Sequence, residues 1–318
     1  MDLDVMFLGT AGSAPTARRG LPATLIRRGG DKLLVDCGEG TQRQLIRSVG
    51  LLDLDAIFIT HFHADHLLGL PGMLKSFSLR GREAPLTIYG PPGLRALLDA
   101  LHPVIGRTTF TFELSELAEK QPLECDGYAI VPFAVEHGVT AYGYALLEHD
   151  RPGRFDPDRA RALGVEDVRE FGRLQAGEAV AGSEGEIRPD QVLGEARRGR
   201  RIVLSGDTAP CELTKAIAGG ADLLVHEATF MDEDAERARA TRHSTARQAA
   251  ELAARAEVTL LALTHVSPRY GGGELRDEAR AAFERTIVPR DFDRVEIPFP
   301  EHGEPRHVRW EDSTRPAV

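Results

Sequence analysis

The chain has 318 residues, of which 42% are hydrophobic and 28% are charged, a balance typical of a globular protein with a substantial core. Its net charge of −10 argues against a broadly basic surface that binds nucleic acid without selectivity. The first residues are acidic, and no apolar run approaches the roughly 18 residues that span a bilayer, so we expect a cytoplasmic protein with no membrane partner.

In chain order, the first third predicts alternating strands and short helices. Apolar runs bounded by turn residues predict strands at 5–8, 24–27, 32–35, 56–60 and 86–89. Gly29-Gly30 predicts a hairpin between the second and third of these strands. Apolar residues at helical spacing predict helices at 41–49, 67–79 and 94–101. Pro71 must lie early in its helix or kink it.

The middle of the chain contains three more predicted strands and then a long polar segment. The strands are expected near 109–113, 128–135 and 142–147. The Gly- and Pro-punctuated segment that follows is too long for a passive connection, so we interpret residues 150–196 as an inserted arm. Residues 151–201 contain eleven arginines and ten acidic residues, whereas the rest of the chain is clearly acidic.

The last third alternates strands with helices. Strands are predicted at 201–205, 223–225 and 260–263, and helices at 213–218, 245–256 and 274–285. Ser244 is the expected cap of the second of these helices. Strands early and strand–helix alternation late are typical of sheets covered by helices, so residues 1–318 are expected to form a single domain with one insertion.

The cysteines do not indicate a crosslinked or thiolate site. Cys37, Cys125 and Cys211 are odd in number, far apart and without C-x-x-C spacing. We expect each to be a small buried residue.

A cluster of histidines and one aspartate directly follows the predicted strand 56–60. His61 and His63 are two residues apart, so in extended backbone their side chains point the same way. Asp65 and His66 follow where the chain turns toward a helix. Four donors within six residues exceed what one tetrahedral metal ion usually takes from a single loop, and the cluster therefore favours two metal ions.

Three further donors end later strands. His137 follows the predicted strand 128–135, Asp207 follows 201–205, and His265 follows 260–263. Because each polar group terminates an apolar strand, all three can converge on one edge of the sheets and complete two coordination spheres.

These residues resemble the H-x-H-x-D-H motif of the metallo-β-lactamase superfamily, which His61, His63, Asp65 and His66 match in full. The resemblance implies an α/β fold, a four-layer αββα sandwich, with two Zn²⁺ per subunit. It assigns one zinc to His61, His63 and His137 and the other to Asp65, His66 and His265. It also implies that Asp207 bridges the two ions.

Other segments are similar to the ribonuclease Z family within that superfamily. The matching segments are 7–10 (F-L-G-T), 35–42 (V-D-C-G-E-G-T-Q), 151–155 (R-P-G-R-F), 226–230 (H-E-A-T-F), 243–246 (H-S-T-A) and 263–270 (L-T-H-V-S-P-R-Y). The resemblance runs from about residue 3 to residue 310 and is to the short form of the family. It implies a zinc-dependent endoribonuclease that removes the 3′ trailer from precursor tRNA, leaving a tRNA 3′-hydroxyl and a 5′-phosphomonoester, without a nucleotide cofactor.

The catalytic roles follow from this family and from acid–base chemistry. Two cations roughly 3.5–4 Å apart can clamp a phosphodiester and lower the pKa of a bridging water toward about 7. Asp65 is the expected proton acceptor, His243 the expected general acid, and Glu227 the residue that orients His243. Without the resemblance, His243 is equally well explained as a capping or surface histidine.

The inserted arm resembles the family's tRNA-binding exosite. A grip far from the cut would measure the shape of the RNA rather than read its bases. The candidate phosphate contacts are Arg151, Arg154, Arg159 and Arg161, although these arginines can also simply pair with neighbouring acids. The resemblance further implies a homodimer.

Two other functions remain open from the residues. A small-molecule phosphodiesterase or arylsulfatase of the same fold needs the same metal ligands but neither the arm nor the His226 and His243 segments. A non-catalytic RNA-binding module would be expected to have lost a ligand or the acid, and every one of these residues is present here.

Overall fold

A computed structural model describes residues 1–119, 121–183 and 185–312. They form two compact units, one made of Met1–Leu147 with the chain from Arg200 onward, and the other of Glu148–Gly199. The arm expected at 150–196 lies within the second unit, which we call the arm unit. No helix in the described ranges is both long and apolar enough to cross a membrane.

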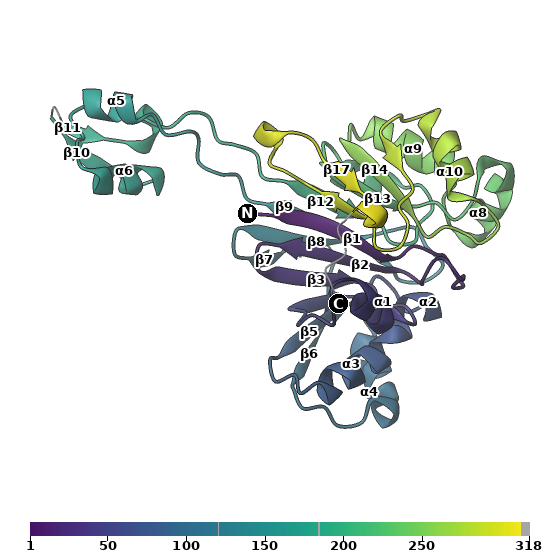
Figure 1. The fold of residues 1–318 in the computed structure, drawn as a ribbon. Helices are drawn as coiled ribbons and strands as arrows, with labels where there is room; N and C mark the ends of the chain where they lie inside the picture. The colour runs from purple at the N-terminus through teal and green to yellow at the C-terminus, as the bar shows by residue number, and fades with distance from the viewer. Residues whose placement is uncertain (120, 184, 313–318) are drawn as a thin grey trace. The chain divides into compact units, whose positions relative to one another are not determined.

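The larger unit contains two mixed sheets (Figure 1). The strands of the first sheet are β1 (Leu3–Gly9), β2 (Ala23–Arg28), β3 (Asp31–Val35), β4 (Ala56–Phe58), β5 (Leu86–Gly90), β6 (Phe112–Glu116), β16 (Arg294–Glu296) and β17 (Arg306–Val308). Their order across the sheet is β17-β16-β1-β2-β3-β4-β5-β6. β2 and β3 form the predicted hairpin, and β3 to β6 run parallel.

The second sheet brings the ends of several strands to one edge. Its strands are β7 (Leu123–Cys125), β8 (Tyr128–Ala134), β9 (Tyr142–Glu148), β12 (Arg201–Leu204), β13 (Leu223–Glu227), β14 (Leu260–Thr264) and β15 (Thr286–Ile287), in the order β15-β14-β13-β12-β9-β8-β7. β12 to β15 run parallel, so their carboxyl ends share one edge of the sheet.

Helices flank both sheets (Figure 1). They are α1 (Thr41–Ser48), α2 (Ala64–Leu67), α3 (Gly69–Leu79), α4 (Leu94–Ile105), α7 (Glu212–Ile217), α8 (Ala235–Thr241), α9 (Ala246–Arg255) and α10 (Gly272–Arg280), with 3₁₀ turns at η2 (Asp232–Asp234), η3 (Pro300–His302) and η4 (Trp310–Asp312).

Strand alternation explains the layers. Val5 and Phe7 of β1 pack between the sheets against residues such as Leu223 of β13. Met6 and Leu8, on the opposite face of β1, pack instead with residues of α1, α3 and α4. A third cluster joins the outer face of the second sheet to α9 and α10. These three cores make an αββα sandwich, as the superfamily resemblance implied.

The arm unit has a small core of its own. Its elements are α5 (Pro157–Ala162), α6 (Val168–Gln175), β10 (Val180–Gly182), β11 (Gly185–Ile187) and η1 (Pro189–Gln191). Asp156 and Asp167 cap the two helices through backbone N–H groups. The two chain segments at its base pair with each other, because the backbones of Arg151 and Arg197 exchange hydrogen bonds of 2.8 and 2.9 Å.

Several local predictions need correction. The helix expected at 67–79 is α3, which begins two residues later, at Gly69, and the separate short helix α2 precedes it; Pro71 lies in the first turn of α3, as expected. Thr245, not Ser244, caps α9: its Oγ1 accepts a hydrogen bond from the Gln248 amide. Cys37 and Cys211 are buried as predicted, but Cys125 is exposed because it lies in β7, at an edge of its sheet. All three cysteines are free.

Candidate metal centre

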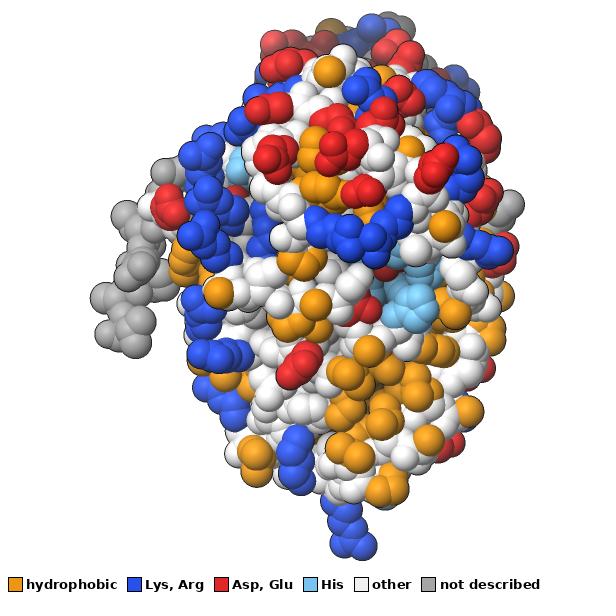
Figure 2. All heavy atoms as spheres, turned by 90° about the vertical axis from the view of Figure 1, so that its right-hand side faces the viewer, with side chains coloured by type: hydrophobic (Ala, Val, Ile, Leu, Met, Phe, Trp, Pro, Cys, Tyr) orange, Lys and Arg blue, Asp and Glu red, His pale blue; other side chains and the backbone are white. Residues whose placement is uncertain are grey.

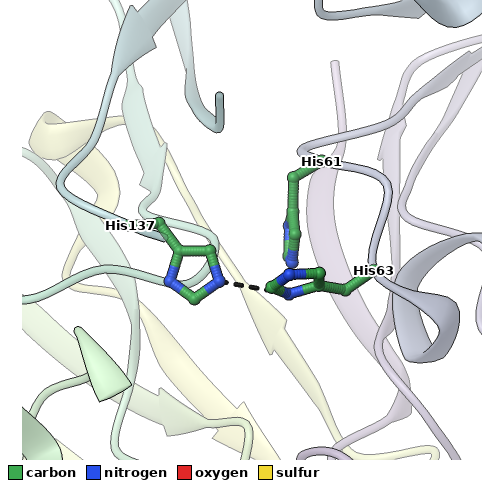
Figure 3. A group of neighbouring side chains, drawn as sticks. All are labelled: His61, His63 and His137. Carbon is green, nitrogen blue, oxygen red and sulfur yellow. Dashed lines mark hydrogen bonds between the residues drawn. The ribbon is translucent and has the colours of Figure 1, made fainter. Parts of the chain in front are cut away.

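Three imidazoles converge at the first predicted metal position (Figure 3). His61 and His63 lie in the turn between β4 and α2, and His137 follows β8. Their ligand nitrogens lie within 4.8 Å of one another, and His137 Nε2 is 3.2 Å from His63 Nδ1. His61 is fully buried and His63 is exposed, so the group reaches from the core to the surface.

The second predicted group lies beside the first. Ligand atoms of Asp65, His66 and His265 are also within 4.8 Å of one another. Asp207 lies between the two groups, with its Oδ2 3.3 Å from His66 Nε2, 3.2 Å from His265 Nε2 and 3.9 Å from His61 Nε2. The structure therefore brings together all seven side chains that the sequence singled out as ligands.

The chemistry of these groups fits divalent cations. In the part of the chain that the structure describes, the ion-pair partners of Asp65 and Asp207 are histidines, not Lys or Arg. The Nε2 atoms of His61 and His66 are buried and form no hydrogen bond among the described residues, although the Asp207 carboxylate lies close to both. A cavity of about 40 Å³ is lined by residues of this cluster, including His66, Asp207 and His265. Buried carboxylates and unpartnered imidazole nitrogens are the features that metal coordination satisfies.

The protonation states of His61, Asp65 and Asp207 suit coordination, whereas His66 must lose a proton. Burial of His66 is outweighed by the charges of Asp207 and Asp36, which raise its pKa, so a metal ion has to displace that proton. Burial, reinforced by neighbouring His66, lowers the pKa of His61 to about 2. Burial alone would raise the pKa of Asp207, but the charges of His265 and His66 outweigh it and hold that pKa well below its ordinary value. For Asp65, burial is likewise outweighed, by the hydrogen bond from His265 and the charge of His66, so its pKa is lowered. Neutral imidazoles and ionised carboxylates are the forms that bind metal ions.

Backbone in the left-handed region surrounds the cluster. Six described non-glycine residues have positive φ, and four of them lie at this site: Ser13 (63°), Asp36 (61°), Arg242 (56°) and His265 (56°). Such conformations are disfavoured for residues with a Cβ and concentrate at functional sites. Each of the first three contacts a predicted ligand, as described below, and the fourth is one.

Asp36 and Ser13 form hydrogen bonds with two of the predicted ligands. Asp36 Oδ2 lies 2.7 Å from His66 Nδ1, and Asp36 also accepts hydrogen bonds from the amide and hydroxyl of Thr60. A carboxylate that accepts the Nδ1 proton leaves Nε2 of His66 as the ligand atom. The Ser13 amide donates to Asp65 Oδ2 at 2.9 Å. Sequence reasoning missed both residues, although Asp36 is a polar group at the end of a strand, the same signal that identified the ligands.

His243 and Glu227 form a close pair beside the cluster. His243 Nδ1 is 2.6 Å from Glu227 Oε1, and the buried Glu227 carboxylate also accepts hydrogen bonds from the amides of Thr208 and Thr229. Burial lowers the pKa of His243, but the charge of Glu227 and its hydrogen bond outweigh burial and raise that pKa to about 9. Ser244, the wrongly predicted cap, donates instead to the Thr208 carbonyl at 2.7 Å and ties this loop to the Asp207 loop.

Four histidines are not part of the cluster. His102, His149 and His302 are exposed, and the partly exposed His307 pairs with Asp293 at 3.0 Å. The four arm arginines lie in the arm unit: Arg154, Arg159 and Arg161 are exposed and Arg151 is partly exposed.

Comparison with known proteins agrees with this fold. The sequence matches the Metallo-beta-lactamase superfamily over residues 19–176 and the Beta-lactamase superfamily domain over residues 173–266. The structure resembles that of the short form of human tRNase Z, with a TM-score of 0.67 and 26% identity over 93% of this chain and 99% of that one. The fold and the donor groups thus define a protein of the metallo-β-lactamase superfamily.

Relatives narrow this assignment. Ribonuclease Z of Natronomonas pharaonis is 45% identical over 307 residues, covering 95% of this chain and all of its own. Ribonuclease Z of Gemmatimonas aurantiaca is 46% identical over 307 residues, covering 95% of this chain and 98% of its own. This chain belongs to the ribonuclease Z family, and the family predicted from its motifs is confirmed.

Proposed function

We propose that the protein is a zinc-dependent endoribonuclease that removes the 3′ trailer from precursor tRNA, leaving a 3′-hydroxyl on the tRNA and a 5′-phosphomonoester on the trailer. One observation carries the proposal: two donor groups share Asp207, with the His243–Glu227 pair next to them. Membership of the ribonuclease Z family supports RNA as the substrate.

Each of the two donor groups is proposed to hold one Zn²⁺. His61, His63 and His137 supply three nitrogens, whereas Asp65, His66 and His265 supply nitrogen and carboxylate oxygen, and both sets are typical of zinc. Asp207 is placed to serve both groups. When bound, such ions polarise a phosphodiester and the water that attacks it.

The proton chemistry is assigned to this chain's own side chains. Asp65, with its lowered pKa and its carboxylate fixed by the Ser13 amide, is ionised at neutral pH and can accept a proton from the attacking water. His243, with its pKa raised to about 9 by Glu227, is charged at neutral pH and can donate a proton to the departing 3′-oxygen of the ribose.

The arm unit is proposed to bind the tRNA away from the cut. A groove of about 460 Å³ is lined by Arg154 together with Pro152, Phe155 and Gln175. A guanidinium beside an apolar ring suits a phosphate with its ribose. Arg161, by contrast, pairs with Asp158 at 2.9 Å, so its charge is already partly offset. Arg154 is therefore the strongest of the four predicted contacts, ahead of Arg151, Arg159 and Arg161.

A homodimer is proposed on the face that carries the histidines. Figure 2 shows hydrophobic side chains gathered next to the exposed histidines. The large exposed apolar side chains of the chain include Leu68 just after α2, Leu79 and Val104 toward the ends of α3 and α4, and Val139 in the loop after His137. Exposed apolar surface of this kind marks interfaces. Sedimentation should give twice the chain mass, and Val104→Asp should shift it toward a monomer if this face is the interface; a monomeric parent would contradict the dimer.

The decisive experiment combines metal analysis with cleavage of a trailer-bearing precursor tRNA. We expect two zinc ions per chain and one cut at the 3′ side of the tRNA, with a 3′-hydroxyl on the upstream product. A parallel assay uses a chromogenic phosphodiester and an aryl sulfate. Hydrolysis of either small ester without cleavage of the RNA would overturn the proposal in favour of a small-molecule hydrolase.

A further inference from the structure

Arg242 occupies a backbone conformation that does not suit its residue type. It ends α8 with φ 56° and ψ 49°, in the left-handed region. Glycine is the usual residue at this position of a helix end, because a Cβ disfavours the conformation. An arginine at this strained position indicates that its side chain has a role.

Arg242 contacts the predicted ligand His137 twice. Its Nη1 donates to the His137 carbonyl at 2.8 Å, and its own carbonyl lies 3.2 Å from His137 Nδ1. A carbonyl can only accept, so the Nδ1 atom carries the proton and Nε2, which faces His63, is left for the metal. Arg242 thus lies on the side of the His137 ring that is turned away from the predicted metal position.

The guanidinium has further donors to offer. Arginine carries five N–H donors in a rigid plane, and the contact to His137 uses one of them. Arg242 is exposed, and among the described residues no carboxylate lies within ion-pair distance of it. Arg247, five residues on, pairs with Asp232 at 3.2 Å.

The position of this charge points to a polyanion. Figure 2 shows Lys and Arg side chains gathered next to the exposed histidines. Arg242 also precedes His243, the proposed proton donor. On a chain with a net charge of −10, cations at the mouth of the site are needed to offset repulsion of RNA.

We propose that Arg242 binds a phosphate of the RNA strand, at the phosphodiester next to the one that is cut. This inference rests on the proposed function. The planar guanidinium matches two phosphate oxygens, and its contact with the His137 carbonyl fixes where it points. Because Arg242 lies behind His137, it reaches a flanking phosphate while the scissile one occupies the metal side of the ring.

The test compares Arg242→Gly, Arg242→Lys and the control Arg239→Ala. The Arg242→Gly protein retains the carbonyl that accepts the hydrogen bond from His137, and glycine adopts the left-handed backbone conformation without strain. Its melting temperature should therefore equal or exceed that of the parent. Arg239 is exposed on α8, and its side chain forms no hydrogen bond or ion pair with the described residues, so its loss removes the same charge without touching His137. Each substitution is made in the zinc-loaded protein and also in an Asp65→Ala background, where precursor tRNA binding is measured without cleavage.

We expect Arg242→Gly to weaken precursor tRNA binding roughly tenfold and to reduce the slope of log affinity against log salt concentration by about one. The affinity of Arg242→Lys should lie between those of the parent and Arg242→Gly. The affinity of Arg239→Ala should stay within about twofold of the parent. The KM for the RNA should rise by at least roughly fivefold more than the KM for a chromogenic phosphodiester, which has no flanking phosphate. Equal losses for Arg242→Gly and Arg239→Ala, or equal losses on the RNA and the small ester, would overturn the proposal. If the parent protein binds precursor tRNA but does not cut it, only the proposed function is overturned. The binding measurements on the Arg242 variants still test the role of Arg242.

Discussion

Around the donor groups, buried carboxylates bind imidazoles and backbone amides, whereas in the arm unit several exposed carboxylates pair with arginines. Asp36 fixes His66, and Glu227 fixes His243, both from buried positions. In the arm unit, Asp158 pairs with Arg161 at 2.9 Å, and the side chains are 91% and 58% exposed. Its core consists of a small cluster that includes Phe171 and Leu174.

Under the proposed function, this difference would divide two tasks between the two regions of the chain. Bond cleavage requires donor atoms held within a fraction of an ångström, and buried networks with strained backbone supply that precision. Binding a large polyanion depends on surface charge and tolerates exposed, solvated side chains. Substitutions in the first region should therefore change rates and metal affinity, and substitutions in the second should change RNA affinity.

The largest effect is expected from Asp65→Ala. The substitution removes a proposed ligand and the proposed proton acceptor together, so turnover of precursor tRNA should fall by more than about 10³-fold while RNA binding largely survives. Asp99→Ala, on the exposed face of α4, is the control and should leave turnover unchanged. Single-turnover cleavage and filter binding separate the two quantities, and undiminished turnover would refute the assigned base.

Glu227→Gln should act through the pH dependence of His243. Because the charged imidazolium is the proposed proton donor, the parent rate should fall as pH rises through about 9. Without the carboxylate charge, burial dominates and the pKa of His243 drops below its ordinary value of 6.5, which moves the alkaline limb to lower pH. At pH 8 the loss should be about 10²-fold on RNA and much smaller on a nitrophenyl ester, whose leaving group needs no proton. If the alkaline limb of the pH–rate profile is unchanged in Glu227→Gln, the His243–Glu227 pair does not set that limb.

Asp36→Asn tests whether the network behind the ligands matters. The amide cannot accept the His66 proton as well as the carboxylate does, so zinc affinity should fall roughly 10- to 100-fold. Competition with a coloured chelator measures this directly, and excess zinc should restore much of the activity. Asp99→Asn serves as the control, and equal zinc affinity in the two variants would contradict a positioning role for Asp36.

The smallest effect is expected in the arm unit. Arg154→Ala should weaken precursor tRNA binding by roughly fivefold and lower the salt slope by about one, because one phosphate contact is lost. Arg161→Ala should cost less, since Asp158 already offsets its charge. Zinc content should be the same in both proteins. If the two variants behave alike, the groove at Arg154 has no special role.

The sequence predicted much of the sandwich and the metal-binding groups because both leave strong local patterns. His137, Asp207 and His265 each end an apolar strand, and the structure brings them together with His61 and His66. The fold class follows from the same strands and from the family resemblance.

Other features depend on contacts between distant segments and left no such pattern. The left-handed conformations of Ser13, Asp36 and Arg242 arise from loops that meet only in the folded chain. α8 was missed because its residues are mostly polar or small and form no apolar stripe, and β16 and β17 because each is only three residues long. In the arm unit, Asp156 and Asp167 each directly precede a helix and cap it, which is a signal that the sequence does contain.

The paired backbone at the base of the arm unit has a consequence for how this protein can be altered. Arg151 and Arg197 exchange hydrogen bonds, so the chain enters and leaves the unit side by side. Everything between them can in principle be cut out and bridged by a tight turn, or exchanged for a foreign module whose ends are equally close. Such chimaeras would retain the residues proposed for hydrolysis and bind a different substrate.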